Sequence, residues 1–181
     1  HLWTRQIGTS AEDVSLGTTT DLFGNIFLAG YTGGALMDTT NAGGLDAFLI
    51  KFSDSGRELW RRQFGSPGDD VALALTTDAE GDVYVVGQTS SSFAEHSSAG
   101  EVDLYLIKFD SGGLLQWSQQ WGTTGHDLGA ELALDVNGQL NLLGLSVLDG
   151  PRTQVEYFYS RFDSSTGELL WTLPLETEVP V

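Results

Sequence analysis

The chain has 181 residues and a mass of 19.5 kDa, and 40% of its residues are hydrophobic, so it is long enough to bury a core. Only 8 Lys and Arg stand against 25 Asp and Glu, and the resulting net charge of -17 argues against binding to nucleic acid or insertion into a membrane. The absence of cysteine excludes disulfides, thiolate metal sites and cysteine nucleophiles.

The pattern along the chain is typical of strands throughout, because short runs of Val, Ile, Leu, Phe and Tyr are bounded by Gly, Asp, Asn and Ser. No segment has helical periodicity. The predicted strands are, in chain order, 2–8, one starting at residue 13, 25–30, 46–52, 59–65, one starting at residue 70, 82–87, 103–109, 116–122, one starting at residue 127, 139–144 and 156–162. Because the chain starts inside such a strand, we expect it to be processed or an excerpt of a longer one.

Four tryptophans divide the chain into repeats. They are spaced by 57, 57 and 54 residues and are Trp3, Trp60, Trp117 and Trp171. Gly, Asp and Lys residues recur in the same register, which is typical of a repeat architecture. We therefore predict a single repeat domain, 1–181, with units 3–59, 60–116 and 117–170 and a closing strand 171–181.

The fold class predicted from these repeats is all-β. The strand DAFLIKF is apolar on both alternating faces, so each sheet must be covered on both sides. Four-stranded antiparallel sheets of 54–57 residues, each lying between its neighbours, are the blades of a β-propeller. A two-sheet sandwich is the alternative architecture.

The repeat unit resembles a known family. Its motifs W-x-x-x-x-G-[TS], D-x-x-G-[ND] and D-x-[FY]-L-I-K-F resemble the bacterial propeller repeats of the SBBP type, along essentially the whole chain. The third unit departs from this pattern, with Glu156 for Asp, Arg161 for Lys and a loop four residues shorter. FDSSTGELLW also resembles the tryptophan-docking repeat of PQQ-type propellers. The SBBP resemblance implies a propeller on secreted or surface proteins of bacteria and an extracytoplasmic location.

The number of blades predicts an unfinished ring. If each blade begins with the NIFLAG-type strand, as in PQQ-like propellers, the chain holds two complete blades between two partial ones, with thirteen strands in all. This is fewer than the minimum of about four blades for a closed ring. The open blade edges then need more of the same polypeptide, further copies, or another protein partner.

Repeated carboxylates are candidate ligands for a hard cation. The geometry of a four-stranded blade places them on one rim, and calcium takes several oxygen ligands. The candidates are Asp13, Asp46, Asp70, Asp103 and Asp127. The favoured interpretation is structural: each Asp caps loop N–H groups and pairs with Lys51, Lys108 or Arg161. No D-x-D-x-D-G run supports a calcium loop.

Long Gly/Ser/Thr-rich loops differ between the repeats, and such loops on a rigid scaffold commonly bind partners. Met37, Phe93 and Leu148 are the apolar residues in them that could anchor a partner, and Trp121, outside the repeat register, is a fourth candidate. Variable solvated loops without a ligand are the alternative. The tryptophans in register are expected to pack between blades rather than to bind sugars.

No catalytic constellation stands out. The three histidines share no metal-ligand spacing, and no G-x-S-x-G, H-E-x-x-H or P-loop motif is present. We therefore expect a non-catalytic structural or interaction module in a larger assembly. No cofactor is expected, and calcium is the one ion that the carboxylates leave open. A carbohydrate-binding propeller that takes a glycan and a fragment of a PQQ-like enzyme are the alternatives.

Overall fold

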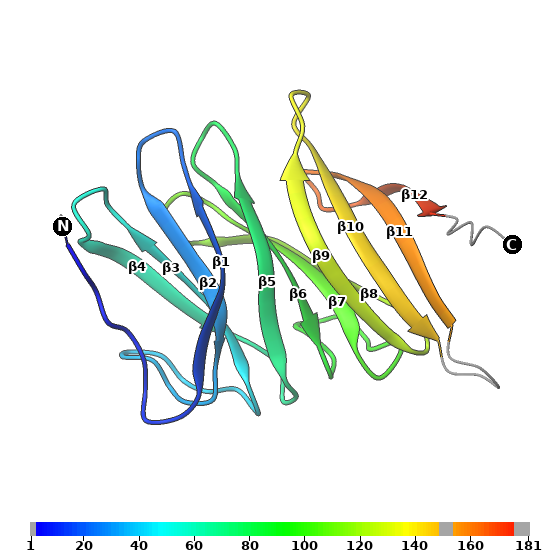
Figure 1. Cartoon of the computed structure of the whole chain (residues 1–181), viewed down its shortest axis with the longest axis horizontal. Helices are drawn as coiled ribbons and strands as arrows, with labels where there is room; N and C mark the ends of the chain where they lie inside the picture. Colours follow the sequence, from blue (N-terminus) through cyan, green and yellow to red (C-terminus); the bar gives the residue numbers. More distant parts are fainter. Residues whose placement is uncertain (1–2, 149–153, 176–181) are drawn as a thin grey trace, which may run out of the picture.

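The computed structural model describes residues 3–148 and 154–175, which form three four-stranded antiparallel sheets (Figure 1). The first sheet consists of β1 (Asp13–Thr20), β2 (Ile26–Thr32), β3 (Asp46–Phe52) and β4 (Glu58–Phe64). The second consists of β5 (Asp70–Thr77), β6 (Val83–Thr89), β7 (Asp103–Phe109) and β8 (Leu115–Trp121). The third consists of β9 (His126–Leu134), β10 (Gln139–Leu148), β11 (Gln154–Asp163) and β12 (Leu169–Leu175).

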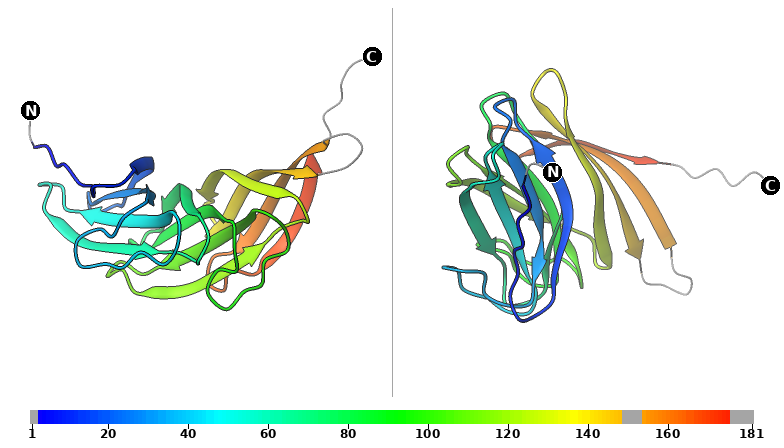
Figure 2. Two further views of the ribbon diagram at one scale, coloured as in Figure 1. Left: turned by 90° about the horizontal axis from the view of Figure 1, so that it is seen from below. Right: turned by 60° about the vertical axis from the view of Figure 1, so that its left-hand side comes forward.

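Within each sheet the strands pair in chain order, so every sheet is a simple meander. The three sheets follow one another along the long axis of the molecule, and the row curves when seen from below (Figure 2). The predicted all-β fold with four-stranded antiparallel blades is confirmed, and the two-sheet sandwich is not formed. The described residues contain no helix that is long and apolar enough to cross a membrane.

The core lies between the sheets. All seven residues of β3 are buried, as the apolar pattern of DAFLIKF predicts. One cluster joins the first and second sheets, where Phe27 and Leu49 meet Tyr105. Another joins the second and third sheets, where Leu104 and Leu106 lie with Leu142. The second sheet is therefore covered on both faces, as the propeller prediction requires.

The strand predicted to begin each blade is wrong: each sheet begins one strand earlier than the NIFLAG-type strand. The tryptophan strand pairs with the strand before it, as Lys51 opposite Trp60 shows, and it is the last strand of its sheet, because β5 begins the next sheet with Asp70 opposite Thr89 of β6. Each sheet therefore begins after the next Gly-[Thr/Ser] turn, with β1, β5 or β9. The described residues thus hold three complete sheets and twelve strands, rather than two complete blades between partial ones. Trp171 lies in β12, the fourth strand of the third sheet, and residues 176–181 of the predicted closing strand lie outside the described residues.

Candidate functional site

Tryptophans at the repeat position connect each sheet to the next. The Nε1–H of Trp60 in β4 donates to the carbonyl of Ser111, 3.0 Å away in the β7–β8 turn. Its ring covers Gly113, where a Cβ would lie 2.8 Å from Trp60 Cδ2 and where φ is +81°. Trp117 repeats the arrangement with the carbonyl of Ser164, at 3.3 Å. The indoles bury apolar area and satisfy their N–H groups, so the expected structural role is what the geometry shows.

The N-terminal segment, residues 3–8, makes the same contacts on the first sheet. Trp3 Nε1–H donates to the carbonyl of Asp54 at 2.9 Å, and Arg5 Nε–H donates to that of Gly56 at 2.8 Å. Arg62 on β4 donates in the same way to Gly113, at 2.6 Å. The N-terminal segment therefore packs on the first sheet as β4 packs on the second sheet. It belongs to no sheet among the described residues.

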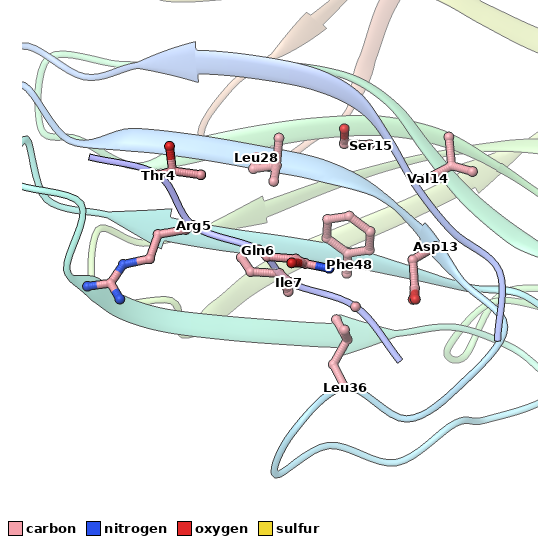
Figure 3. Close-up of a pocket in the computed structure, with 11 residues that line it drawn as sticks. Thr4, Arg5, Gln6, Ile7, Asp13, Val14, Ser15, Leu28, Leu36 and Phe48 are labelled. Atoms are coloured by element: carbon pink, nitrogen blue, oxygen red, sulfur yellow. The ribbon is translucent and has the colours of Figure 1, made fainter. Parts of the chain in front are cut away.

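A cavity of about 480 Å³ lies between the N-terminal segment and the first sheet. Figure 3 shows Ile7 of the segment near Phe48 and Leu36, and the three belong to one apolar group. Arg5 points away from this group (Figure 3). The segment therefore covers the face of the first sheet only in part.

Trp171, the last tryptophan in the repeat register, has no following sheet in the described part of the chain. The Trp171 side chain on β12 is 42% exposed and contacts Tyr159, with ring centroids 5.5 Å apart. Cross-strand pairing places the neighbouring apolar side chains on the same face. This terminal face consists of Leu143, Tyr157, Trp171, Leu173 and Leu175, all of them exposed. The matching face of the second sheet, with Leu104 and Trp117, is packed against the third sheet.

The repeated aspartates cap backbone N–H groups. Asp70 Oδ2 accepts the N–H of Ser66 at 2.5 Å, and Asp13 and Asp127 repeat this bond with the N–H of Thr9 and Thr123. The second series does the same from the β2–β3 and β6–β7 loops. Asp46 accepts the N–H of Ala42 at 2.8 Å and the Gln63 amide at 2.8 Å, and Asp103 accepts those of Ala99 and Gln120 at 2.7 and 2.8 Å. Each of the five therefore accepts at least one backbone N–H.

The expected pairing of these aspartates with the repeat cations is wrong. Lys51 lies near the far end of β3 from Asp46, so the two cannot meet. Each cation instead pairs with an aspartate of the turn between the first two strands of its sheet. The pairs are Lys51 with Asp21 at 3.3 Å, Lys108 with Asp82 at 3.0 Å and Arg161 with Asp135 at 3.0 Å. The cations have a structural role on the opposite rim.

The described residues offer one observation against the predicted metal site and one in its favour. No group of three or more His, Asp or Glu side chains that could hold a metal occurs among the described residues. Asp46 and Asp70 approach each other at the turn of Gly65, and their Oδ1 atoms are buried without a hydrogen-bond partner. Burial raises the pKa of Asp70, hydrogen bonds from Thr89 and Ser66 lower it in part, and the charge of Asp46 raises it further. The calcium hypothesis for the five repeat aspartates therefore stays an untested alternative to capping, and Asp46 and Asp70 are the pair with free carboxylate oxygens.

Phe93 is not the exposed anchor that its loop suggests. The side chain is 4% exposed and stacks on Tyr105, with centroids 4.7 Å apart and planes 6° from parallel. It also meets Phe64 edge-on, at 6.2 Å and 87°. Its backbone N–H donates to Gln120 Oε1 at 2.7 Å. The loop is therefore closed over its own phenyl ring, which is unavailable to a partner.

The other partner candidates lie in different environments. Met37 is 72% exposed, and Leu148 is half-buried at the end of β10. Trp121 is half-buried at the end of β8, where its ring lies 4.8 Å from that of Phe162. It also lines a pocket of about 240 Å³ on the third sheet. The structure does not bring Met37, Leu148 and Trp121 together into one surface, and no sequence motif signals this pocket.

Four-stranded sheets in a curved row, each joined to the next by a tryptophan, define a β-propeller repeat protein. Residues 2–36 and 59–94 match the model of the SBBP family, a beta-propeller repeat, which is the family that the motifs resemble.

Two curated proteins are similar to the chain. The "Uncharacterized WD repeat-containing protein L264" of Acanthamoeba polyphaga mimivirus is 21% identical over 182 residues, which cover 79% of this chain and 13% of that protein. The "Regulatory protein FlaEY" of Caulobacter vibrioides is 26% identical over 114 residues, which cover 59% of this chain and 12% of that protein. The chain thus spans 12% to 13% of the length of these relatives.

Proposed function

We propose that the chain is a non-catalytic interaction module that packs, through its terminal face, against a further sheet of the same repeat type in a larger extracytoplasmic assembly of a bacterium. The observation that carries this proposal is the exposure of Trp171. Trp60 and Trp117, its counterparts, each cover the turn of a following sheet. The third sheet presents the same side chain with nothing described beyond it.

The composition of the terminal face supports the proposal. Leu173 and Leu175 lie opposite Tyr159 and Tyr157 on the neighbouring strand, which makes the patch continuous. Contiguous apolar patches on soluble proteins commonly mark interaction sites. A second copy or another part of the parent polypeptide would bury this face, as the third sheet buries the matching face of the second sheet. On the first sheet, the N-terminal segment already covers the turn where a tryptophan would dock.

The absence of catalysis and the location are parts of the same proposal. The described carboxylates at repeat positions are engaged in caps and ion pairs, which supports a structural use. The SBBP repeats and the net charge of -17 suit a secreted or surface protein. A panel of PQQ-dependent and glycosidase assays and a glycan array test the alternatives. Turnover or specific glycan binding would contradict the proposal.

The native mass of the purified chain tests the interaction surface. We expect a defined multiple of 19.5 kDa at micromolar concentrations, and a return to the monomer in the Leu173→Lys variant, because an unpaired charge cannot be buried in an apolar contact. Val136→Lys, at a fully exposed turn, is the matched control and should leave the mass unchanged. A wild-type monomer whose mass, solubility and melting temperature match those of the Leu173→Lys variant would show that this face packs against nothing.

A further inference from the structure

The third sheet has a pocket in the place that Phe93 fills on the second sheet. The pocket measures about 240 Å³. Its lining includes two aromatic rings and several hydroxyl groups, which belong to Trp121, Phe158, Ser146, Ser160 and Thr172. It lies between the second and third sheets, because Trp121 ends β8 and Phe158 belongs to β11.

Strand register shows which residues correspond. Phe109 pairs with Val83 in the second sheet as Phe162 pairs with Leu140 in the third. Counting back four residues along each strand, Phe158 corresponds to Tyr105, the ring on which Phe93 stacks. Trp121 ends the fourth strand of its sheet as Phe64 does, and Phe64 is the ring that meets Phe93 edge-on. The pocket is therefore lined by Phe158 and Trp121, the counterparts of the two rings that hold Phe93.

The third repeat has lost both the ring and the contact that holds it. Its loop is four residues shorter, and the sequence between Leu148 and Glu156 contains no aromatic residue. Pro174 stands at the position of Gln120, whose Oε1 accepts the backbone N–H of Phe93. A proline side chain accepts no hydrogen bond, so Pro174 cannot hold a backbone N–H in the way that Gln120 holds that of Phe93.

We propose that this pocket binds one planar aromatic ring carrying a hydroxyl group, stacked on Phe158 and with an edge toward Trp121. A volume of about 240 Å³ suits a single ring and is small for a drug-sized ligand. The phenol preference follows from Ser160, which replaces the apolar Ile107 and shares a 2.7 Å hydrogen bond with Thr172. These hydroxyls offer a partner to a polar substituent that a purely apolar slot would lack.

The phenol ring has two sources, a tyrosine side chain of a polypeptide or a free small phenol. Titrations of the intact chain with p-cresol and with N-acetyl-tyrosinamide, followed by NMR shifts of the Trp121 indole and the Thr172 methyl, separate them. Comparable or tighter binding of N-acetyl-tyrosinamide points to a polypeptide, and binding of p-cresol alone points to a small molecule. Cyclohexylmethanol, of similar size but not planar, should bind more weakly than p-cresol because it cannot stack.

Two matched variants test the role of the ring surface. Phe158→Leu keeps the apolar character of the pocket but removes the stacking surface, so we expect p-cresol binding to weaken by roughly threefold to tenfold. Phe48→Leu makes the same change at the corresponding position of the first sheet, beside Leu36, and should leave p-cresol binding unchanged. Equal weakening by both variants would overturn the assignment.

A gain-of-binding variant keeps the test decisive if Phe158→Leu fails to fold. Phe93→Ala empties the space that the Phe93 ring fills between Phe64 and Tyr105. p-Cresol should raise the melting temperature of this variant by occupying that space. If p-cresol rescues Phe93→Ala but causes no shift at Trp121 or Thr172 in the wild-type chain at millimolar concentration, the third-sheet pocket does not bind phenols and the proposal is wrong. The native-mass experiment on the terminal face is independent of this outcome.

Discussion

Lys51 and Asp21 form an ion pair that is almost completely buried. Lys51 Nζ lies 3.3 Å from Asp21 Oδ2, and the two side chains are 5% and 0% exposed. The ammonium group also lies 4.8 Å from the centre of the Phe27 ring and donates to the carbonyl of Ser111 on the next sheet, at 3.1 Å. This pair therefore joins the turn of one sheet to the last hairpin of the following sheet.

Replacing Lys51 by methionine should destabilise the protein by roughly 3–5 kcal/mol, because the carboxylate of Asp21 would be left buried without its cation. Chemical denaturation measures this free energy. Arg57→Met, which removes an exposed cation from a turn of the same sheet, is the control and should change the stability by no more than about 0.5 kcal/mol. The double variant Lys51→Met/Asp21→Asn should recover part of the loss. A Lys51→Met variant as stable as the control would contradict this account.

The stability of the fold should fall in acid, and Asp21 should contribute to the fall. Burial raises the pKa of Asp21, but hydrogen bonds from Asn25 and the charge of Lys51 outweigh it and hold the pKa below its ordinary value of 3.8. The unfolded chain therefore binds the proton more tightly than the folded one. The stabilisation is complete well above the unfolded pKa and is lost as the pH falls through the folded one.

Melting temperatures between about pH 6 and pH 2 measure this dependence. The Asp21→Asn variant should be less stable than the wild type near neutral pH and should lose less stability on acidification. Asp70 acts in the opposite direction, because burial raises its pKa and its protonation favours the folded state. Parallel melting curves for the wild type and Asp21→Asn over this range would show that Asp21 does not contribute.

The parts of the structure that follow from local pattern could be predicted from the sequence. Strands such as DAFLIKF, apolar on both faces, imply sheets covered on both sides, and Trp60 and Trp117 are packing residues as their regular spacing indicates. The phase of the blades could not be predicted in this way. A repeat has the same sequence whichever strand begins it. Only the strand pairing shows where one sheet ends, because β4 pairs with β3 and β5 pairs with β6, with Asp70 opposite Thr89.

Long-range contacts account for the other differences. Phe93 lies in a Ser-rich loop that looks solvent-exposed, but Tyr105 and Phe64 provide a stacking site for it from two different sheets. The pocket on the third sheet has no motif of its own in the sequence, because it results from the loss of such a residue. A comparison of the three loops, with Leu36 and Phe93 aligned and no counterpart in the third, is the signal that could have revealed it.

Phe93 and Met37 should respond oppositely to truncation. Phe93→Ala should cost about 3–5 kcal/mol of stability, since it removes a ring stacked between two sheets. Met37→Ala, which shortens an exposed side chain in the equivalent loop of the first sheet, should change the stability by no more than about 0.5 kcal/mol. Denaturant unfolding of both variants compares them directly. Equal stabilities would mean that Phe93 is not a core residue.

Calcium should leave the melting temperature unchanged between millimolar calcium and an excess of chelator. The aspartates at the predicted positions already accept backbone N–H groups, as Asp103 does from Ala99, and the described residues hold no cluster of three ligand side chains. Six to eight oxygen ligands are needed for calcium, so two carboxylates alone form a weak site. Only the buried Oδ1 atoms of Asp46 and Asp70, among these aspartates, lack a hydrogen-bond partner in the described structure. A clear rise of the melting temperature with calcium, lost in Asp70→Asn but kept in Asp13→Asn, would place an ion between the first and second sheets and replace the capping account there.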